Sequence, residues 1–401
     1  MLKNKNFLFL LFGQSAANIG DTLYIISVIS AIYNLTHSVI ASSLVPTVIT
    51  CAMVIASFMS PLFTNKLKLN HILVSTQLIK AVFLAGLLFY IKNGFVKQNI
   101  FGLFVIISII AFSDGFAQPV SQSILPHYAA DNDLVKSNSI LNTSFQILGI
   151  GGWAGGSILL AWLSVPSILV LSLALASLSV ILLLQLQSVR IDQQTSGNNS
   201  IWHNLLKGWR TIDTVPLLKL TAVISILDTF ANSVWISSII LAFVQKTLNA
   251  SQYWWGYINA AYMFGGVLGG VLCYRLSQRI AKNPFSVMIT GTTIVALVTF
   301  VVSINSNMWI LLCLSGLVGI FGELKDIPQT ALIQSRTDNK LLPNVFSSLT
   351  VLYTGTFSMA SIFVSALSEQ FGVRFVFVIS SFLLVIVSVL LFFNKRLINQ
   401  N

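Results

Sequence analysis

The sequence predicts an all-α membrane protein with about twelve transmembrane helices in two pseudo-symmetric six-helix bundles. Of its 401 residues, 55% are hydrophobic and only 8% are charged, whereas about a quarter of the residues of a soluble domain are charged. Crossing a hydrocarbon core of about 30 Å takes about 20 apolar residues, and such stretches follow one another along the chain at short intervals. This composition excludes a soluble globule and leaves no room for a separate catalytic domain.

Six apolar stretches make up the first half of the chain. The first begins after Lys5 and continues to about Tyr33. It is longer than the apolar core of a signal peptide, so we expect a membrane helix there. The expected helices of this half are 7–33, 38–63, 71–92, 99–126, 136–162 and 165–188.

The second half contains six more apolar stretches, and a polar run separates the halves. The expected helices are 215–243, 251–274, 284–305, 308–333, 343–368 and 372–394. The run between Ser188 and Pro216 includes Gln193–Ser200 and has the composition of a linker. We therefore expect an N-terminal six-helix bundle at 1–188, a cytoplasmic linker at 189–215 and a C-terminal six-helix bundle at 216–401.

An amphipathic helix is expected within this linker. Apolar side chains recur there at helical spacing with basic side chains beside them, namely Trp202, Leu205, Leu206 and Trp209 with Lys207 and Arg210. A helix of this kind lies in the membrane interface, where its basic residues reach lipid headgroups. We expect it to tether the halves, with a regulatory role as the alternative.

The distribution of basic residues predicts the orientation. If the N-terminus is cytoplasmic, the outer loops hold only Lys92, Lys97, Lys246 and Arg374. The other basic residues, apart from two inside apolar stretches, then lie on the cytoplasmic side, as the positive-inside rule requires. We expect a multi-pass protein of the cell inner (plasma) membrane with both termini cytoplasmic. The net charge of +11 follows from these loops and indicates no nucleic-acid partner.

The second half repeats features of the first. Asp114 lies five residues before Pro119, and Glu323 lies five residues before Pro328, each near the end of a fourth helix. This repeat indicates a duplicated six-helix unit, and such repeats in transporters place the substrate site between the halves. Lys325, two residues after Glu323, is expected to point to another side of its helix.

Ionisable side chains within the apolar stretches are the main functional candidates, because each costs about 2.5 to 3.5 kcal/mol at the centre of a membrane helix. We expect proton coupling or substrate binding at Asp21, Lys80, Asp114, Asp228 and Glu323. Asp21 is the leading protonation site, since a carboxyl group in a partly dry cavity can take up a proton on one side and release it on the other. The alternatives for Asp21 are an inter-helix hydrogen bond and a position at the outer surface.

Polar side chains recur at helical spacing beside these acids. Lipid offers such groups no partner, so the stripes that they form are expected to face a wet cavity or another polar helix. The expected cavity-lining residues are Gln14 and Asn18 beside Asp21, Gln118 and Gln122 beside Asp114, Asn232 and Trp235 beside Asp228, and Asp326 beside Glu323.

Lys80 lies about nine residues inside its expected helix. That depth corresponds to about 13 Å, beyond the reach of a lysine side chain that snorkels to the surface. We expect a salt bridge to Asp21 or Asp114, with an anionic substrate as the alternative. For Asp114 and Glu323, the two interpretations are a gate latch formed with a basic residue, and a site that binds substrate or protons.

Several motifs occur together along the chain. They are Gly13-Gln14 and Gly20-Asp21 in the first helix, the run from Pro119 to Lys136, the linker pattern Trp202-x5-Gly208-Trp209 ahead of Pro216, and Gly151, Gly152, Gly155 and Gly156 in the fifth helix. In these features the whole chain resembles the major facilitator superfamily, and within it the macrolide-efflux-like branch of drug/proton antiporters. The glycines resemble an antiporter motif, with Gly152 where proline is usual. The resemblance implies two six-helix bundles whose first and fourth helices line a central cavity.

A loop motif of the superfamily is present in altered form. The family pattern between the second and third helices is Gly-x-x-x-Asp-Arg followed by basic residues; here Asn65 stands in place of the acid, and Lys66 and Lys68 follow. The corresponding loop of the second half ends in Arg275, again without an acid. The resemblance implies that these four residues belong to gate loops.

These features predict a secondary active transporter that exports amphipathic or cationic compounds in exchange for protons by alternating access. One alternative is a transporter of a native metabolite such as a siderophore or lysophospholipid. The other is a non-transporting membrane sensor or assembly partner. We expect a monomer in the lipid bilayer that binds a small molecule. We expect no enzymatic activity, no cofactor and no metal, since there is no phosphate-binding loop and Cys51, Cys273 and Cys313 have no ligand-spaced neighbours.

Overall fold

The structure is a computed structural model that describes residues 4–37, 39–94, 99–130, 133–190, 201–235, 237–251 and 253–395. The predicted linker run 193–200, together with Lys3 and Lys97, lies outside these ranges. In the described residues, twelve spans are long and apolar enough to cross a membrane. Helices and no strands make up the regular secondary structure of these residues, which confirms the predicted all-α membrane fold.

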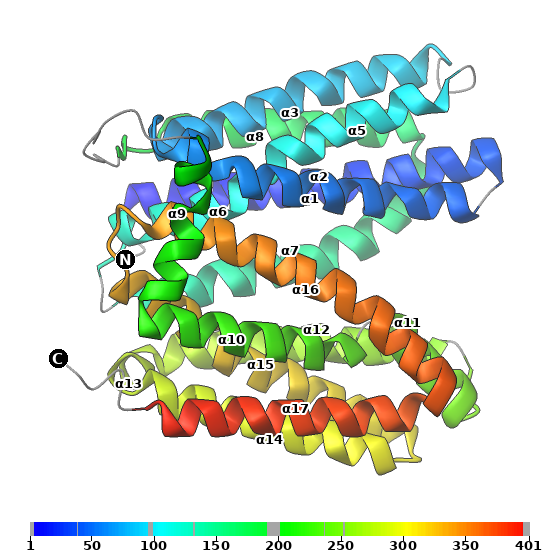
Figure 1. Ribbon diagram of the computed structural model, residues 1–401. Coiled ribbons are helices and arrows are strands. Elements are labelled where there is room, and N and C mark those ends of the chain that lie inside the picture. Colours follow the sequence, from blue (N-terminus) through cyan, green and yellow to red (C-terminus); the bar gives the residue numbers. More distant parts are fainter. Residues whose placement is uncertain are drawn as a thin grey trace. The chain divides into compact units, whose positions relative to one another are not determined.

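The first half of the chain supplies six of these spans. The helices are α1 (Lys5–Thr36), α2 (Val39–Thr64), α3 (Leu69–Lys92), α5 (Ile100–Asp114) continued by α6 (Ala117–Tyr128), α7 (Leu134–Trp162) and α8 (Val165–Leu184). Helix α8 packs against both α1 and α3, while α5 packs against α2 and α3 (Figure 1). The core of this bundle is almost entirely aliphatic, with Leu84, Leu103 and Ile107 fully buried.

The second half supplies the other six. Its long helices are α10 (Pro216–Asn232), α12 (Tyr253–Arg275), α14 (Pro284–Ile304), α15 (Met308–Arg336), α16 (Leu342–Phe371) and α17 (Val373–Phe393). Helix α12 packs along α15, and α14 packs against α15 and α17. The amphipathic linker helix that the sequence predicts is present as α9 (Ile201–Thr214).

The contacts between residues divide the chain into two compact units, and each unit contains residues from both halves of the sequence. Unit 1 comprises residues 1–130, 147–209 and 338–351, and unit 2 comprises 131–146, 210–337 and 352–401. The first part of α7 thus belongs to unit 2 and its second part to unit 1, while the first part of α16 belongs to unit 1 and the rest to unit 2.

The predicted helix 99–126 is broken after Asp114. Pro119 has no backbone N–H, so the carbonyl oxygen of Gly115 lacks its usual helical donor. The Ser57 hydroxyl donates to that oxygen instead, at 2.8 Å. Gly115 also lies so close to the backbone of Met53 that a Cβ would stand 2.6 Å from the Met53 carbonyl oxygen. The break therefore follows from proline chemistry and close packing on α2.

The predicted helix 215–243 is also interrupted. A short 3₁₀ helix covers Ser233–Trp235, followed by α11 (Ser237–Ala242) and a π-helical turn (Phe243–Thr247). The Ser233 hydroxyl donates to the Phe230 carbonyl oxygen at 2.7 Å. This bond competes with the backbone for that acceptor, as serine side chains often do at helix ends.

Glycines permit close helix contacts in both units. In unit 1, Gly152 and Gly156 of α7 face α1, where a Cβ on Gly156 would stand 2.7 Å from Ile26. Gly151 and Gly155 have open space around them. In unit 2, Gly265 of α12 packs directly on the backbone of Gly316 in α15. Small faces of this kind let membrane helices approach closely without any hydrophobic driving force.

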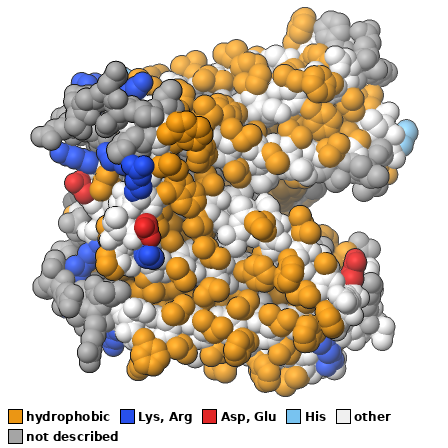
Figure 2. All heavy atoms as spheres, in the orientation of Figure 1, with side chains coloured by type: hydrophobic (Ala, Val, Ile, Leu, Met, Phe, Trp, Pro, Cys, Tyr) orange, Lys and Arg blue, Asp and Glu red, His pale blue; other side chains and the backbone are white. Residues whose placement is uncertain are grey.

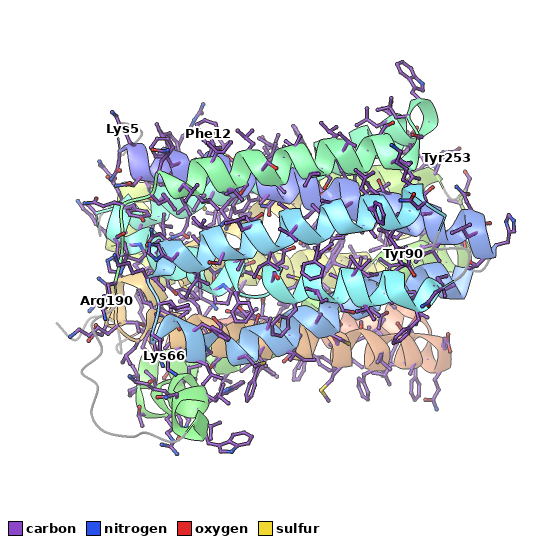
Figure 3. All side chains as sticks on the ribbon, turned by 90° about the horizontal axis from the view of Figure 1, so that it is seen from above. Lys5, Phe12, Lys66, Tyr90, Arg190 and Tyr253 are labelled. Atoms are coloured by element: carbon purple, nitrogen blue, oxygen red, sulfur yellow. The ribbon has the colours of Figure 1, made fainter. Side chains whose placement is uncertain are left out.

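Apolar side chains cover the flanks of each unit (Figure 2). Large hydrophobic residues with more than half of their surface exposed include Phe12, Trp162, Ile362 and Phe393. Aqueous solvent would disfavour such a surface, whereas lipid tails match it. In unit 1, Lys5, Lys66 and Arg190 lie at one end of the bundle and Tyr90 lies toward the other (Figure 3).

We expect Gly265→Ala to lower the thermal stability of the detergent-purified protein, because the new methyl group would overlap the Gly316 carbonyl. Overpacking of this kind costs about 1 to 3 kcal/mol. The matched control is Gly256→Ala in the same helix, where nothing lies within 4 Å of the added Cβ; it should be neutral or slightly stabilising. Equal melting temperatures for the two variants would contradict the packing described here.

Candidate functional site

A buried lysine in unit 1 is held between two carboxylates. Lys80, on α3, has 1% of its side chain exposed, and its Nζ lies 2.7 Å from Asp21 Oδ1 on α1 and 2.5 Å from Asp114 Oδ1 at the end of α5. We call these three residues the first lysine cluster. The salt bridge predicted for Lys80 is present, and it engages both acids rather than one.

Local structure positions this cluster. Asp114 is the last residue of α5, so the break at Gly115 ends the helix just beyond this carboxylate. The buried phenol of Tyr24, on α1, is close enough to both carboxylates to interact with them electrostatically. Asp21 keeps 24% of its side chain exposed, so it is neither fully buried nor free at the outer surface.

Unit 2 contains a second buried lysine with two carboxylates. Lys325 Nζ lies 2.7 Å from Asp228 Oδ2 and 2.9 Å from Asp326 Oδ1, and Asn232 hydrogen-bonds to Asp228. We call Lys325, Asp228 and Asp326 the second lysine cluster. The sequence predicts that Lys325 points to another side of its helix than Glu323, and its ammonium pairs instead with Asp228 on α10 and with the adjacent residue Asp326.

A hydrogen-bonded group lies one helical turn from the second cluster. The Gln329 amide nitrogen donates to the Ser225 hydroxyl at 2.8 Å and to the Tyr353 hydroxyl at 3.3 Å. Ser225 and Tyr353 are themselves 3.0 Å apart. These neutral side chains can hold the hydroxyl or amine groups of a ligand as donors or acceptors.

Glu323 stands apart from both lysines. Its Oε1 accepts from the Gln146 amide of α7 at 2.5 Å, and its Oε2 is buried without a hydrogen-bond partner among the described residues. Within the part of the chain that the structure describes, no basic residue pairs with it. Glu323 thus forms no ion pair among the described residues, whereas Asp114 pairs with Lys80.

The remaining predicted cavity residues differ in environment. Gln14 is buried, Asn18 and Gln122 are half-buried, and Gln118 is exposed. Trp235 packs edge-on against Phe377 and donates to the Thr299 hydroxyl at 3.4 Å. The tryptophan thus contributes to the apolar core of unit 2.

The predicted gate-loop residues lie at helix ends. In unit 1, the Asn344 amide of α16 donates to Asn65 Oδ1 at 3.3 Å, so the asparagine that replaces the family's acid contacts this helix. Lys68 directly precedes α3, and Lys66 is exposed. In unit 2, Arg275 ends α12 and is exposed.

The linker helix is anchored to α16 within unit 1. Gly208 lies so close to the Asn344 carbonyl and the Ser348 hydroxyl that a side chain would not fit. Burial lowers the pKa of Lys207 on the same helix, and the Asp338 carboxylate partly offsets this shift. Trp202 remains 66% exposed.

Each lysine cluster holds one more carboxylate than ammonium. With all groups ionised, each therefore carries one net negative charge, and its buried members are costly to leave uncompensated. A proton or an organic cation would neutralise that charge. Among the described residues, no group of three or more His, Cys, Asp or Glu side chains could hold a metal ion.

Comparison with known proteins identifies the family. The model of the Major Facilitator Superfamily matches residues 10–340 and 221–399. The chain belongs to the Major Facilitator Superfamily. Members of this superfamily are transporters that carry small molecules across lipid bilayers, so the protein is a multi-pass membrane transporter and not an enzyme.

Individual members of the superfamily are similar over almost the whole chain. The uncharacterized MFS-type transporter YfmI of Bacillus subtilis (strain 168) is 29% identical over 384 residues, which covers 96% of this chain and 95% of YfmI. The E. coli fucose:proton symporter FucP is similar in structure, with a TM-score of 0.77, 13% identity and 97% coverage of each chain. The human organic anion transporter MFSD10 gives a TM-score of 0.76 at 13% identity, covering 96% and 99%.

Two polar residues near these sites were not among the predicted ones. Gln329 follows Glu323 on α15, and Gln146 is an isolated amide in the largely apolar α7. Their signal in the sequence is the presence of a polar group within a membrane helix. Which partner each one meets depends on helix rotation, which the sequence pattern does not specify.

We expect Lys80→Met to destabilise the protein strongly, because it leaves two carboxylates buried without a counter-charge. Removing one partner of a buried ion pair costs about 3 to 5 kcal/mol. The control is Lys219→Met. Lys219 pairs with Asp213 at 2.8 Å on the surface and, chiefly by hydrogen bonding, lowers the pKa of that carboxyl. Exposed ion pairs contribute little to stability, so Lys219→Met should hardly change the melting temperature. An equal decrease in both variants would contradict the assigned role of Lys80.

Proposed function

We propose that the protein is a secondary active exporter that exchanges an amphipathic or cationic compound for protons by alternating access. The observation that carries this proposal is the excess of one carboxylate over ammonium in each lysine cluster. A proton and a cationic cargo are alternative ways to neutralise the same negative charge. Competition between them for one site is the simplest basis for exchange.

Both clusters have features that suit this role. Asp21 is one-quarter exposed while bonded to a fully buried lysine, so it can meet a ligand without leaving the cluster. In unit 2, Asp326 is 58% exposed and bonded to Lys325. Glu323 and Asp114 are further protonation candidates. The macrolide-efflux-like motifs support drug efflux as the physiological role.

Transport of a native metabolite is the second candidate. For an anionic cargo such as a siderophore or lysophospholipid, Lys80 would be the natural ligand. Its ammonium already contacts two carboxylates within 2.5 to 2.7 Å, which favours a cationic cargo over an anionic one. A non-transporting sensor would need neither cluster to bind a ligand or a proton.

For the membrane topology, we propose an inner (plasma) membrane location with both termini cytoplasmic and a monomeric protein. The positions of Lys5, Lys66 and Arg190 at one end of unit 1 support this orientation (Figure 3). We further propose that residues 189–215 connect two functional halves, with α9 lying on the inner leaflet.

The test is proton-gradient-driven uptake into inverted membrane vesicles, with cationic dyes, macrolides and lysolipids as separate cargoes. We expect at least one cationic dye or macrolide to accumulate. The Asp21→Asn variant should reduce that uptake to background, because the first cluster then has no excess negative charge.

The matched control is Asp213→Asn, which removes an exposed carboxylate of the surface linker helix and should leave uptake unchanged. If Asp21→Asn transports as well as the parent, the exchange mechanism is wrong. Uptake of lysolipid alone would favour the metabolite transporter, and no uptake of any cargo by a correctly inserted protein would favour the sensor.

A further inference from the structure

Unit 1 contains a row of buried amides that leads to the first lysine cluster. Along α3, Asn70, Gln77 and Lys80 are 5%, 1% and 1% exposed. At about 100° per residue they fall within an arc of about 80° on one helix face. From Asn70 to Lys80 this face extends for about 15 Å along the helix axis.

Helix α1 contributes a fourth member to this row. Gln14 lies seven residues before Asp21, which returns it to nearly the same side of the helix. Because Asp21 contacts Lys80 on α3, Gln14 also faces toward α3, about 10 Å nearer the start of α1. Helices α1 and α3 both start beside the segment 187–189. The Asn6 side chain hydrogen-bonds to the Gln187 side chain, and the Leu69 backbone N–H donates to the Val189 carbonyl oxygen. Gln14 is therefore level with the stretch between Asn70 and Gln77.

Several polar atoms in this row are buried and have no hydrogen-bond partner within the described part of the chain. They are Asn70 Oδ1, Gln14 Nε2 and Gln77 Oε1. Thr76, a buried neighbour on α3, instead donates to its own helix at the Leu73 carbonyl. Buried water molecules characteristically bind polar groups that the protein leaves unsatisfied, making about three hydrogen bonds each. Successive members of the row are offset by about 4 to 6 Å along the axis, and water molecules can bridge polar groups that do not touch directly.

We propose that Asn70, Gln14 and Gln77 hold a file of water molecules that conducts protons between the start of α3 and Asp21. This inference rests on the proposed function, because the water file would be the path by which protons reach the exchange site of the proposed exporter. At each step a water molecule accepts a proton from one neighbour and donates another to the next. The terminal acceptor is the Asp21 carboxylate, which becomes a neutral carboxyl group while Lys80 stays charged.

Both ends of the file reach accessible positions. Asn70 lies next to the exposed His71 at the start of α3, and Asp21 is 24% exposed at the other end. The titratable groups facing Lys80 are Asp21 and Tyr24 of α1 and Asp114 of α5. Helix α8, which packs against both α1 and α3, has no titratable side chain. Helix α6, which also packs against α1 and α3, contributes His127 and Tyr128, and the Tyr128 hydroxyl donates to the Gln187 carbonyl oxygen at 2.7 Å.

The experiment measures how fast a proton reaches Asp21 from each side of a membrane. The full chain is reconstituted in vesicles with uniform orientation, in both possible directions. After an external acid pulse, time-resolved infrared spectroscopy follows the carboxyl band that disappears in Asp21→Asn. No cargo is needed, so the result is separate from the transport assay.

We expect Gln77→Leu to slow protonation from the α3-start side by about tenfold or more, as a barrier raised by about 1.4 kcal/mol would do. Protonation from the other side should keep the parent rate. Gln77→Ser, which leaves a hydroxyl and room for water, should restore much of the lost rate. Thr76→Val, which removes a hydroxyl already satisfied by its own helix, should have no effect from either side.

Three outcomes in the variants would overturn the proposal. They are an unchanged rate in Gln77→Leu, an equal slowing from both sides, and an equal slowing in Thr76→Val. Absence of any Asp21 carboxyl band in the parent would also overturn it. If the file operates but uptake in the vesicle assay is absent, the proton path stands and the proposed cargo exchange fails.

Discussion

A lysine ammonium can remain inside a membrane protein only if carboxylates compensate its charge, and this requirement determines how the helices of each unit are placed. Removing an ammonium or carboxylate from water costs several kcal/mol even after relaxation. For Lys80, ion pairs with Asp21 and Asp114 offset this desolvation cost, and they form only where α1 and α5 both approach α3. The ion pair of Lys325 with Asp228 forms only where α10 lies beside α15. Few rotations or translations of these helices satisfy both the ion pairs and the apolar packing around them.

The two clusters share a principle but differ in construction. In each half of the chain the first helix contributes an acid, Asp21 or Asp228. The lysine comes from the third helix in unit 1 and from α15, the fourth helix of the repeat, in unit 2. The repeated acid–proline spacing therefore does not produce equivalent sites. Asp114 joins a lysine cluster and ends a helix, whereas Glu323 bonds an amide inside a continuous helix.

Much of this fold could be predicted from the sequence, because hydropathy alone identifies membrane helices when lipid forces every backbone group into hydrogen bonds. The pairing of Lys80 with acids was predictable, since a lysine too deep to reach the membrane surface needs a counter-charge. The break after Asp114 was not predicted, because it depends on Ser57 from another helix reaching the Gly115 carbonyl. The partners of Lys325 were not predicted, because side-chain spacing gives the direction of a Cβ atom but not the path of a long flexible stem.

The division of α7 and α16 between the compact units has a consequence for how the chain folds during synthesis. Unit 1 includes residues 338–351, which lie more than a hundred residues beyond the polar linker. The N-terminal bundle therefore leaves the ribosome and enters the membrane without all of the residues that complete it. The contacts of residues 338–351 within unit 1 can form only after nearly the entire polypeptide has been made, so a cut at the linker would place parts of one compact unit on two separate fragments.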